Sequence, residues 1–112
     1  MTLYGYWRCS TNIQDQERQV IALKEEGITE ENIYGDKTTG TSNYGAREEL
    51  SKCLDLLQQD DLVILEDMTR LGKTMVPMLV EVNNLIERGV YIKTLDGRLD
   101  AFLMNDDIVR LI

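Results

Sequence analysis

Residues 61–67 read DLVILED, a continuous apolar run bounded by acidic residues. Such a run is typical of a strand that is covered on both faces, as in parallel sheets packed between helices. Amphipathic helices are predicted on both sides of it, over REELSKCLDLLQQ (47–59) and TMVPMLVEVNNLIERG (74–89), because apolar residues recur there every three or four positions. A buried strand between two such helices indicates an α/β fold.

The same alternation continues towards both ends of the chain. Strands are predicted over 2–8 (TLYGYWR), 31–37 (ENIYGDK) and 90–96 (VYIKTLD), and a helix over 13–27, where Gly27 is the stop signal. This order predicts three layers: a central, mostly parallel sheet of four to five strands with helices on both faces. The 112 residues have the size of one domain.

The predicted helices also indicate which residues form the core. Cys9 and Cys53 lie in apolar settings without a CxxC spacing, so we expect buried thiols rather than a disulfide or a zinc site. The helical residues expected to face the sheet are Ile13, Val20, Ala22, Leu23, Leu50, Cys53, Leu54, Leu57, Met75, Met78, Leu79, Val82, Leu85 and Ile86.

Composition limits the classes of function. The chain is 43% hydrophobic and 29% charged, as in soluble globular proteins, and it has neither a signal-peptide pattern nor an apolar run near the ~20 residues that span a bilayer. We therefore expect a cytoplasmic protein without membrane contact. The net charge of −8 argues against a broadly basic nucleic-acid surface but allows a local basic site. The absence of histidine excludes Ser-His-Asp and Cys-His catalysis.

Candidate functional residues lie where the predicted strands end, because the carboxyl ends of parallel strands meet at one edge of the sheet. After the first strand, Arg8 and Ser10 lie two residues apart, so both side chains point the same way in an extended segment. Thr11 and Gln14 have the spacing of a helix capping box, which is the purely structural interpretation of this stretch.

Two further loops bring basic residues to the same edge: Arg47 precedes the second helix, and Arg70 and Lys73 follow the third strand. Guanidinium groups around a hydroxyl suit phosphoryl transfer, in which charge on the phosphate oxygens must be stabilised. The LGKT stretch before the third helix is similar to part of a nucleotide-binding phosphate loop. Asp67 stands where that motif needs glycine, so nucleotide binding is not expected.

Four motifs occur in order along the chain: Y-x-R-x-S-T-x-x-Q from Tyr6, D-K-x-x-G from Asp36, R-x-x-L from Arg47, and R-L-G-K from Arg70. With them, the chain resembles the catalytic domain of the serine recombinases, the resolvase and invertase family. The resemblance implies that Ser10 attacks a phosphodiester of double-stranded DNA and forms a covalent 5′-phosphoserine link. It also implies dimers and tetramers of the full-length protein.

The resemblance assigns roles residue by residue. Arg8, Arg47 and Arg70 would bind and polarise the scissile phosphate, and Lys73 would take the place of the family's second arginine in that loop. No cofactor, metal or small-molecule ligand is implied. The positions that match supporting residues of the family are Tyr6, Gln14 and Gln19.

Two positions depart from the family pattern. Thr69 stands where the family usually has an aspartate, with Asp67 two residues earlier, and Lys73 replaces an arginine and so loses two-point hydrogen bonding. The alternative function is therefore a catalytically impaired relative that binds DNA or regulates a recombinase. By the same resemblance, residues 105–112 (NDDIVRLI) would be the start of the family's long dimerisation helix. We thus expect residues 1–112 to be a catalytic domain without the DNA-binding domain, with little activity alone.

Overall fold

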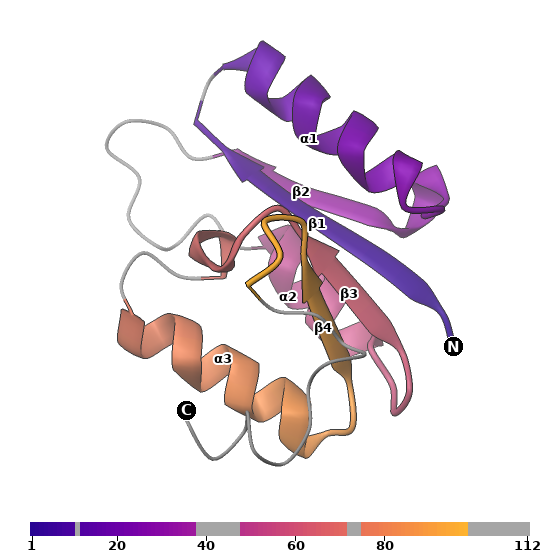
Figure 1. Ribbon diagram of the computed structural model, residues 1–112, viewed down its shortest axis with the longest axis vertical. Coiled ribbons are helices and arrows are strands. Elements are labelled where there is room, and N and C mark those ends of the chain that lie inside the picture. Colours follow the sequence, from indigo (N-terminus) through magenta and orange to yellow (C-terminus); the bar gives the residue numbers. More distant parts are fainter. Residues whose placement is uncertain (11, 38–47, 72–74, 99–112) are drawn as a thin grey trace.

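The computed structural model describes residues 1–10, 12–37, 48–71 and 75–98, and its centre is a four-stranded sheet (Figure 1). The strands lie in the order β2-β1-β3-β4, and every neighbouring pair is parallel. Their bounds are β1 Leu3–Cys9, β2 Ile33–Lys37, β3 Leu62–Leu65 and β4 Tyr91–Thr94.

Helices cover both faces of this sheet, which confirms the predicted three-layer α/β fold (Figure 1). α1 (Ile13–Glu25) lies on one face, whereas α2 (Glu48–Leu56) and α3 (Met75–Glu87) pack on the other. Two short 3-10 helices, η1 (Glu30–Asn32) and η2 (Met68–Arg70), complete the described elements, and η2 occupies part of the stretch expected to be a loop. In these described parts, no helix is both long and apolar enough to cross a membrane.

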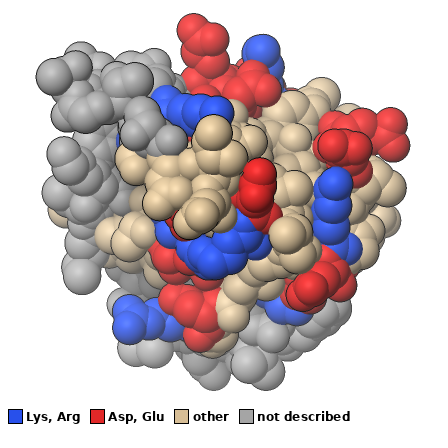
Figure 2. All heavy atoms as spheres, turned by 90° about the horizontal axis from the view of Figure 1, so that it is seen from above, with Lys and Arg blue, Asp and Glu red and all other residues tan. Residues whose placement is uncertain are grey.

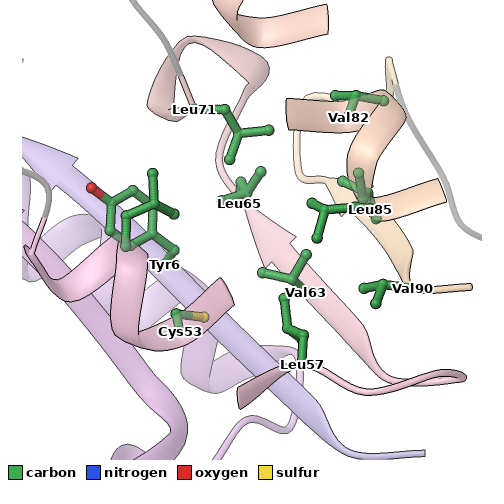
Figure 3. Close-up of a cluster of buried hydrophobic side chains, with 11 residues drawn as sticks. Tyr6, Cys53, Leu57, Val63, Leu65, Leu71, Val82, Leu85 and Val90 are labelled. Atoms are coloured by element: carbon green, nitrogen blue, oxygen red, sulfur yellow. The ribbon is translucent and has the colours of Figure 1, made fainter. Parts of the chain in front are cut away.

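The larger core cluster lies between the sheet and the helices α2 and α3 (Figure 3). Side chains alternate along β3, so Val63 and Leu65 enter this cluster while Leu62 and Ile64 face α1. All four residues of β3 are buried, as the apolar run predicted. The residues of α2 and α3 that are fully buried here are Leu50, Cys53, Val82 and Leu85, with Leu57 following α2.

The opposite face is closed by α1 and the segment that follows it. Leu23 and Ile28 pack there against Leu62 and Ile64. Gly5 in β1 permits this close approach, because a Cβ at that position would lie 2.9 Å from Cδ1 of Ile28. The same Cβ would lie 3.2 Å from Cδ1 of Leu23, so the glycine also lets α1 pack closely on the strand that leads to the candidate site.

The start of α1 differs from the prediction. Asn12, not Thr11, is the N-cap, and its side chain accepts hydrogen bonds from the backbone N–H groups of Gln14 and Asp15. Ile13 is 60% exposed rather than buried, because the buried side of α1 is formed further along, by Gln19 and Leu23. Thr11 and the side chain of Met75 lie outside what the structure describes.

Candidate active site at the carboxyl ends of the strands

Ser10 lies immediately after β1, at the carboxyl edge of the sheet, and its side chain is exposed. It borders an open hollow of about 380 Å³ at the start of α1. The other residues that line this hollow are Asn12, Gln14, Asp15 and Arg18. A hydroxyl in this position is accessible to a large substrate.

Arg70 is brought to the same edge by η2, which follows β3. Its Nη1 donates a 2.8 Å hydrogen bond to the backbone carbonyl of Arg8, although 62 residues separate the two. The side chain is only 20% exposed. The guanidinium group of Arg70 is therefore held against the backbone of β1, two residues before Ser10.

Two carboxylates contact Arg70 from its own segment. Nη2 of Arg70 lies 3.3 Å from Oε1 of Glu66 and 3.7 Å from Oδ2 of Asp67. Oδ1 of Asp67 accepts hydrogen bonds from the backbone N–H and from the hydroxyl of Thr69, the N–H bond being 2.9 Å long. Asp67 is thus the N-cap of η2, and Thr69 fixes its orientation beside Arg70.

Arg18 in α1 also reaches this cluster. Its guanidinium group makes two contacts with Glu66, of 2.9 Å from Nη1 to Oε2 and 3.1 Å from Nη2 to Oε1, and a third of 2.5 Å with Asp15. The hydrogen bonds that Arg18 donates to Glu66 and Asp15, in that order of size, raise the pKa of Arg18. The family motifs do not include Arg18, and its partner Glu66 is 48 residues away. The sequence therefore offered no signal for this contact.

Gln19 fixes the backbone of β1 just before Ser10. Its Nε2 donates to the carbonyl of Arg8 at 3.0 Å, and its Oε1 accepts from the N–H of Arg8 at 3.3 Å. The side chain is 1% exposed. Gln14, by contrast, is exposed at the rim of the hollow, and its backbone N–H donates to Asn12.

Tyr6 leads to a residue that the sequence analysis did not assign. Its hydroxyl donates a 2.7 Å hydrogen bond to Oδ2 of Asp36, which is 7% exposed, and Figure 3 shows the phenol oxygen turned away from the aliphatic cluster. Each carboxylate oxygen of Asp36 also accepts one backbone N–H of α2, from Glu49 and Leu50, at 3.1 Å. Asp36 opens the D-K-x-x-G motif, and that position was the available signal.

The structure thus brings five of the assigned residues to one edge, Arg8 through its backbone groups, and Tyr6 supports this edge from within the core. Arg47 and Lys73 lie outside the described residues, so their placement stays a prediction. In the ranges that the structure covers, no group of three or more acidic or cysteine side chains is arranged to hold a metal ion. The five residues at the edge are Arg8, Ser10, Gln19, Asp67 and Arg70.

Charges of both signs surround this region. Figure 2, which views the molecule from the side of α1, shows blue and red side chains interspersed among the described residues of this face, which form no continuous basic patch. This distribution agrees with the net charge of −8. An anion at this edge would therefore be bound by a few arginine side chains in defined positions, and not attracted by the net electrostatic potential of the domain.

The fold and the residues at this edge define a class of protein. It is a parallel α/β domain with an exposed serine at the end of a strand and, at the same edge, arginines that form ion pairs with carboxylates. The family model described as "Resolvase, N terminal domain" matches residues 3–110. The chain therefore belongs to the resolvase family, and its resemblance to the serine recombinase catalytic domain is confirmed.

Curated relatives agree with this assignment. The chain is 37% identical to a resolvase of Clostridium perfringens over 100 residues, which cover 88% of the chain and 52% of that protein. It is 36% identical to the serine recombinase gin of Escherichia phage Mu (88% of the chain, 49% of gin). It is 29% identical to the transposon Tn3 resolvase of Escherichia coli (90% and 54%). The chain thus spans about half the length of these relatives.

Proposed function

We propose that this chain is the catalytic domain of a site-specific DNA recombinase in which Ser10 is the nucleophile. The observation that carries the proposal is the hydrogen bond from Arg70 to the carbonyl of Arg8, since it holds a guanidinium group beside the strand that ends at Ser10. Family membership supports the same reaction, because related proteins are named resolvase and serine recombinase.

In the proposed reaction, Oγ of Ser10 attacks the phosphorus of a DNA phosphodiester. A bond forms between Oγ and phosphorus, the bond from phosphorus to the 3′ oxygen breaks, and the DNA is left attached through a 5′-phosphoserine. The Oγ proton is lost as the bond forms, and the departing 3′ oxygen gains one, so no net proton is consumed. Religation is the reverse attack by a 3′-hydroxyl of another strand.

The arginines supply the electrostatic part of this reaction. Arg8 comes from the end of β1 and Arg70 from η2 at the described edge, and Arg47 and Lys73 are proposed to join them. One guanidinium group can donate two hydrogen bonds to the non-bridging oxygens of a phosphate. It also stabilises the negative charge that grows on these oxygens in the transition state. No metal or cofactor takes part in the proposal.

The serine is tested in the full-length protein with DNA that carries its recombination site. Ser10→Ala should abolish the covalent protein–DNA adduct seen after denaturing electrophoresis. Ser51→Ala is the matched control, because Ser51 is an exposed serine of α2. An adduct that persists in the Ser10 variant would exclude this mechanism.

The alternative proposal is an impaired relative that binds DNA or regulates a partner recombinase. It rests on Thr69 and Lys73, which replace an aspartate and an arginine of the family pattern. The position of Asp67 argues against it, since a carboxylate still lies 3.7 Å from Arg70. A large gain in adduct formation in the double variant Thr69→Asp, Lys73→Arg would favour impairment, and no gain would favour an intact site.

The partners proposed are double-stranded DNA and further copies of the same protein. We propose dimers and tetramers of a longer protein, in which DNA-binding residues outside this chain supply most of the affinity. The acidic balance of the chain supports this division, because a net charge of −8 gives a duplex little general attraction. A cytoplasmic location is part of the same proposal.

A further inference from the structure

Glu66 lies between two arginines that come from different elements. Its Oε1 accepts a 3.1 Å hydrogen bond from Nη2 of Arg18 in α1, and its Oε2 forms a 2.9 Å ion pair with Nη1 of Arg18 that lacks hydrogen-bond geometry. Its contact with Arg70 is a single, longer one of 3.3 Å. Glu66 is therefore paired mainly with Arg18, and only secondarily with Arg70.

This unequal sharing matters for an anion that would bind Arg70. The best hydrogen bond of Arg70 goes to a neutral carbonyl, that of Arg8 at 2.8 Å. If Glu66 had no other partner, its full charge would be balanced by Arg70, and the contact would shorten. A phosphate would then compete with a carboxylate for the same N–H groups.

We propose that Arg18 is a positioning residue for the active site, because it holds Glu66 and so leaves the guanidinium group of Arg70 available to the DNA phosphate. The inference rests on the proposed function of the Ser10 edge. Arg18 acts through Glu66, and no contact between Arg18 and DNA is required. The side chain of Arg18 is 56% exposed, so it can be substituted without opening the core.

The test is a set of variants of the full-length protein, assayed for the rate of Ser10–DNA adduct formation at saturating site DNA. Arg18→Gln should slow adduct formation on the order of tenfold, the size of coupling expected between contacting charged groups. Adding Glu66→Gln to this variant should restore the rate, because the competing charge is gone. Lys24→Gln removes a positive charge from the same helix away from this cluster, and it should leave the rate unchanged.

A second double variant separates this mechanism from simple charge repulsion. Arg18→Gln with Asp15→Asn restores the same net charge as Arg18→Gln with Glu66→Gln, but among the described residues Asp15 forms its ion pair with Arg18 and none with Arg70. Positioning predicts rescue by Glu66→Gln alone. Equal rescue by both would overturn the proposal, and no rescue by Glu66→Gln would show instead that Arg18 itself contacts the substrate.

A measurement without DNA keeps this inference separate from the recombinase proposal. Nε of Arg70 is buried and has no hydrogen-bond partner among the described residues, so its N–H signal in a nitrogen-15 NMR spectrum reports on the guanidinium environment. The signal should shift in Arg18→Gln and return in the double variant with Glu66→Gln. If the wild-type protein forms no adduct but this pattern appears, the recombinase proposal fails and the positioning contact stands. An unmoved Arg70 signal in Arg18→Gln would overturn the positioning contact.

Discussion

Thr69 is the residue at which the candidate site departs most from the family pattern, yet its side chain makes a specific hydrogen bond within the site. Its hydroxyl and its N–H both donate to Oδ1 of Asp67, and this leaves Oδ2 turned towards Arg70. We propose that Thr69 and Asp67 together supply the carboxylate beside Arg70 that one aspartate supplies in the family pattern. We interpret the pair as a relocated carboxylate.

Replacing Thr69 tests this interpretation. Thr69→Val removes the hydroxyl donor and keeps the shape, so Asp67 loses one of two hydrogen bonds and turns more freely. Adduct formation should slow by about three- to tenfold, which corresponds to roughly one hydrogen bond of ~1 kcal/mol. Thr69→Ser, which retains the hydroxyl, should keep the wild-type rate, and equal rates for both variants would contradict the interpretation.

Asp36 is the second residue with a specific expected effect. Each of its oxygens accepts one backbone N–H of α2, so Asp36→Asn would turn its amide nitrogen towards a donor in either orientation. Leaving a buried donor unpaired costs about 1–3 kcal/mol. Urea unfolding should show a loss of this size, and it should be absent in Asp55→Asn, a matched change at an exposed position of α2. Unchanged stability of Asp36→Asn would mean that the hydrogen bonds from Glu49 and Leu50 to Asp36 contribute little to the stability of the fold.

At the scale of elements, α1 connects Ser10 to the two arginines that contact Glu66, which are Arg18 and Arg70. It begins beside Ser10, and its next turns carry Arg18 and Gln19, which contact Glu66 and the backbone of Arg8. The helix is in turn fixed at its N-terminus by Asn12 and against the sheet by Leu23. Its first turn is therefore both a structural cap and one wall of the hollow.

The cap of α1 can be weakened without touching the arginines. Asn12→Ala removes the acceptor for the N–H groups of Gln14 and Asp15, and such a loss typically costs about 1 kcal/mol. Thermal unfolding should reveal the loss, and Asn12→Asp should remain close to wild type. Destabilisation of the same size in both variants would show that Asn12 stabilises the domain by something other than accepting these two hydrogen bonds.

At the scale of the whole molecule, the sequence was sufficient to predict the sheet, but it was insufficient to predict the side-chain contacts between distant elements. The run 61–67 predicted a strand buried on both faces, since hydrophobic periodicity reports burial directly. The pairing of Arg18 with Glu66 depends on where two distant elements come to lie, and no local pattern encodes that. Ile13 was wrongly placed in the core because apolar spacing does not reveal where a helix leaves the sheet.

The free energy of unfolding of the domain should decrease at alkaline pH, because the thiol of Cys53 is buried in the core. Burial raises the pKa of Cys53 from 9.0 to about 12. Between these values the unfolded chain loses the thiol proton and the folded chain keeps it. Ionisation therefore favours unfolding as the pH rises, by at most about 1.4 kcal/mol per pH unit. The stability difference between wild type and Cys53→Ala should thus shrink from pH 8 to pH 10.5 in urea titrations. A constant difference would contradict the burial of a neutral thiol.

The sheet has one further consequence. β1 pairs with β2 as far as Cys9, but its pairing with β3 stops at Tyr6. Beyond Tyr6, the peptide of Arg8 is bonded by side chains, from Gln19 and Arg70. A difference in length between two neighbouring strands thus creates the place where a guanidinium group can dock on the main chain. If β3 continued beside β1 to Arg8, peptide groups would take that place, so the early end of a strand is itself a requirement of the site.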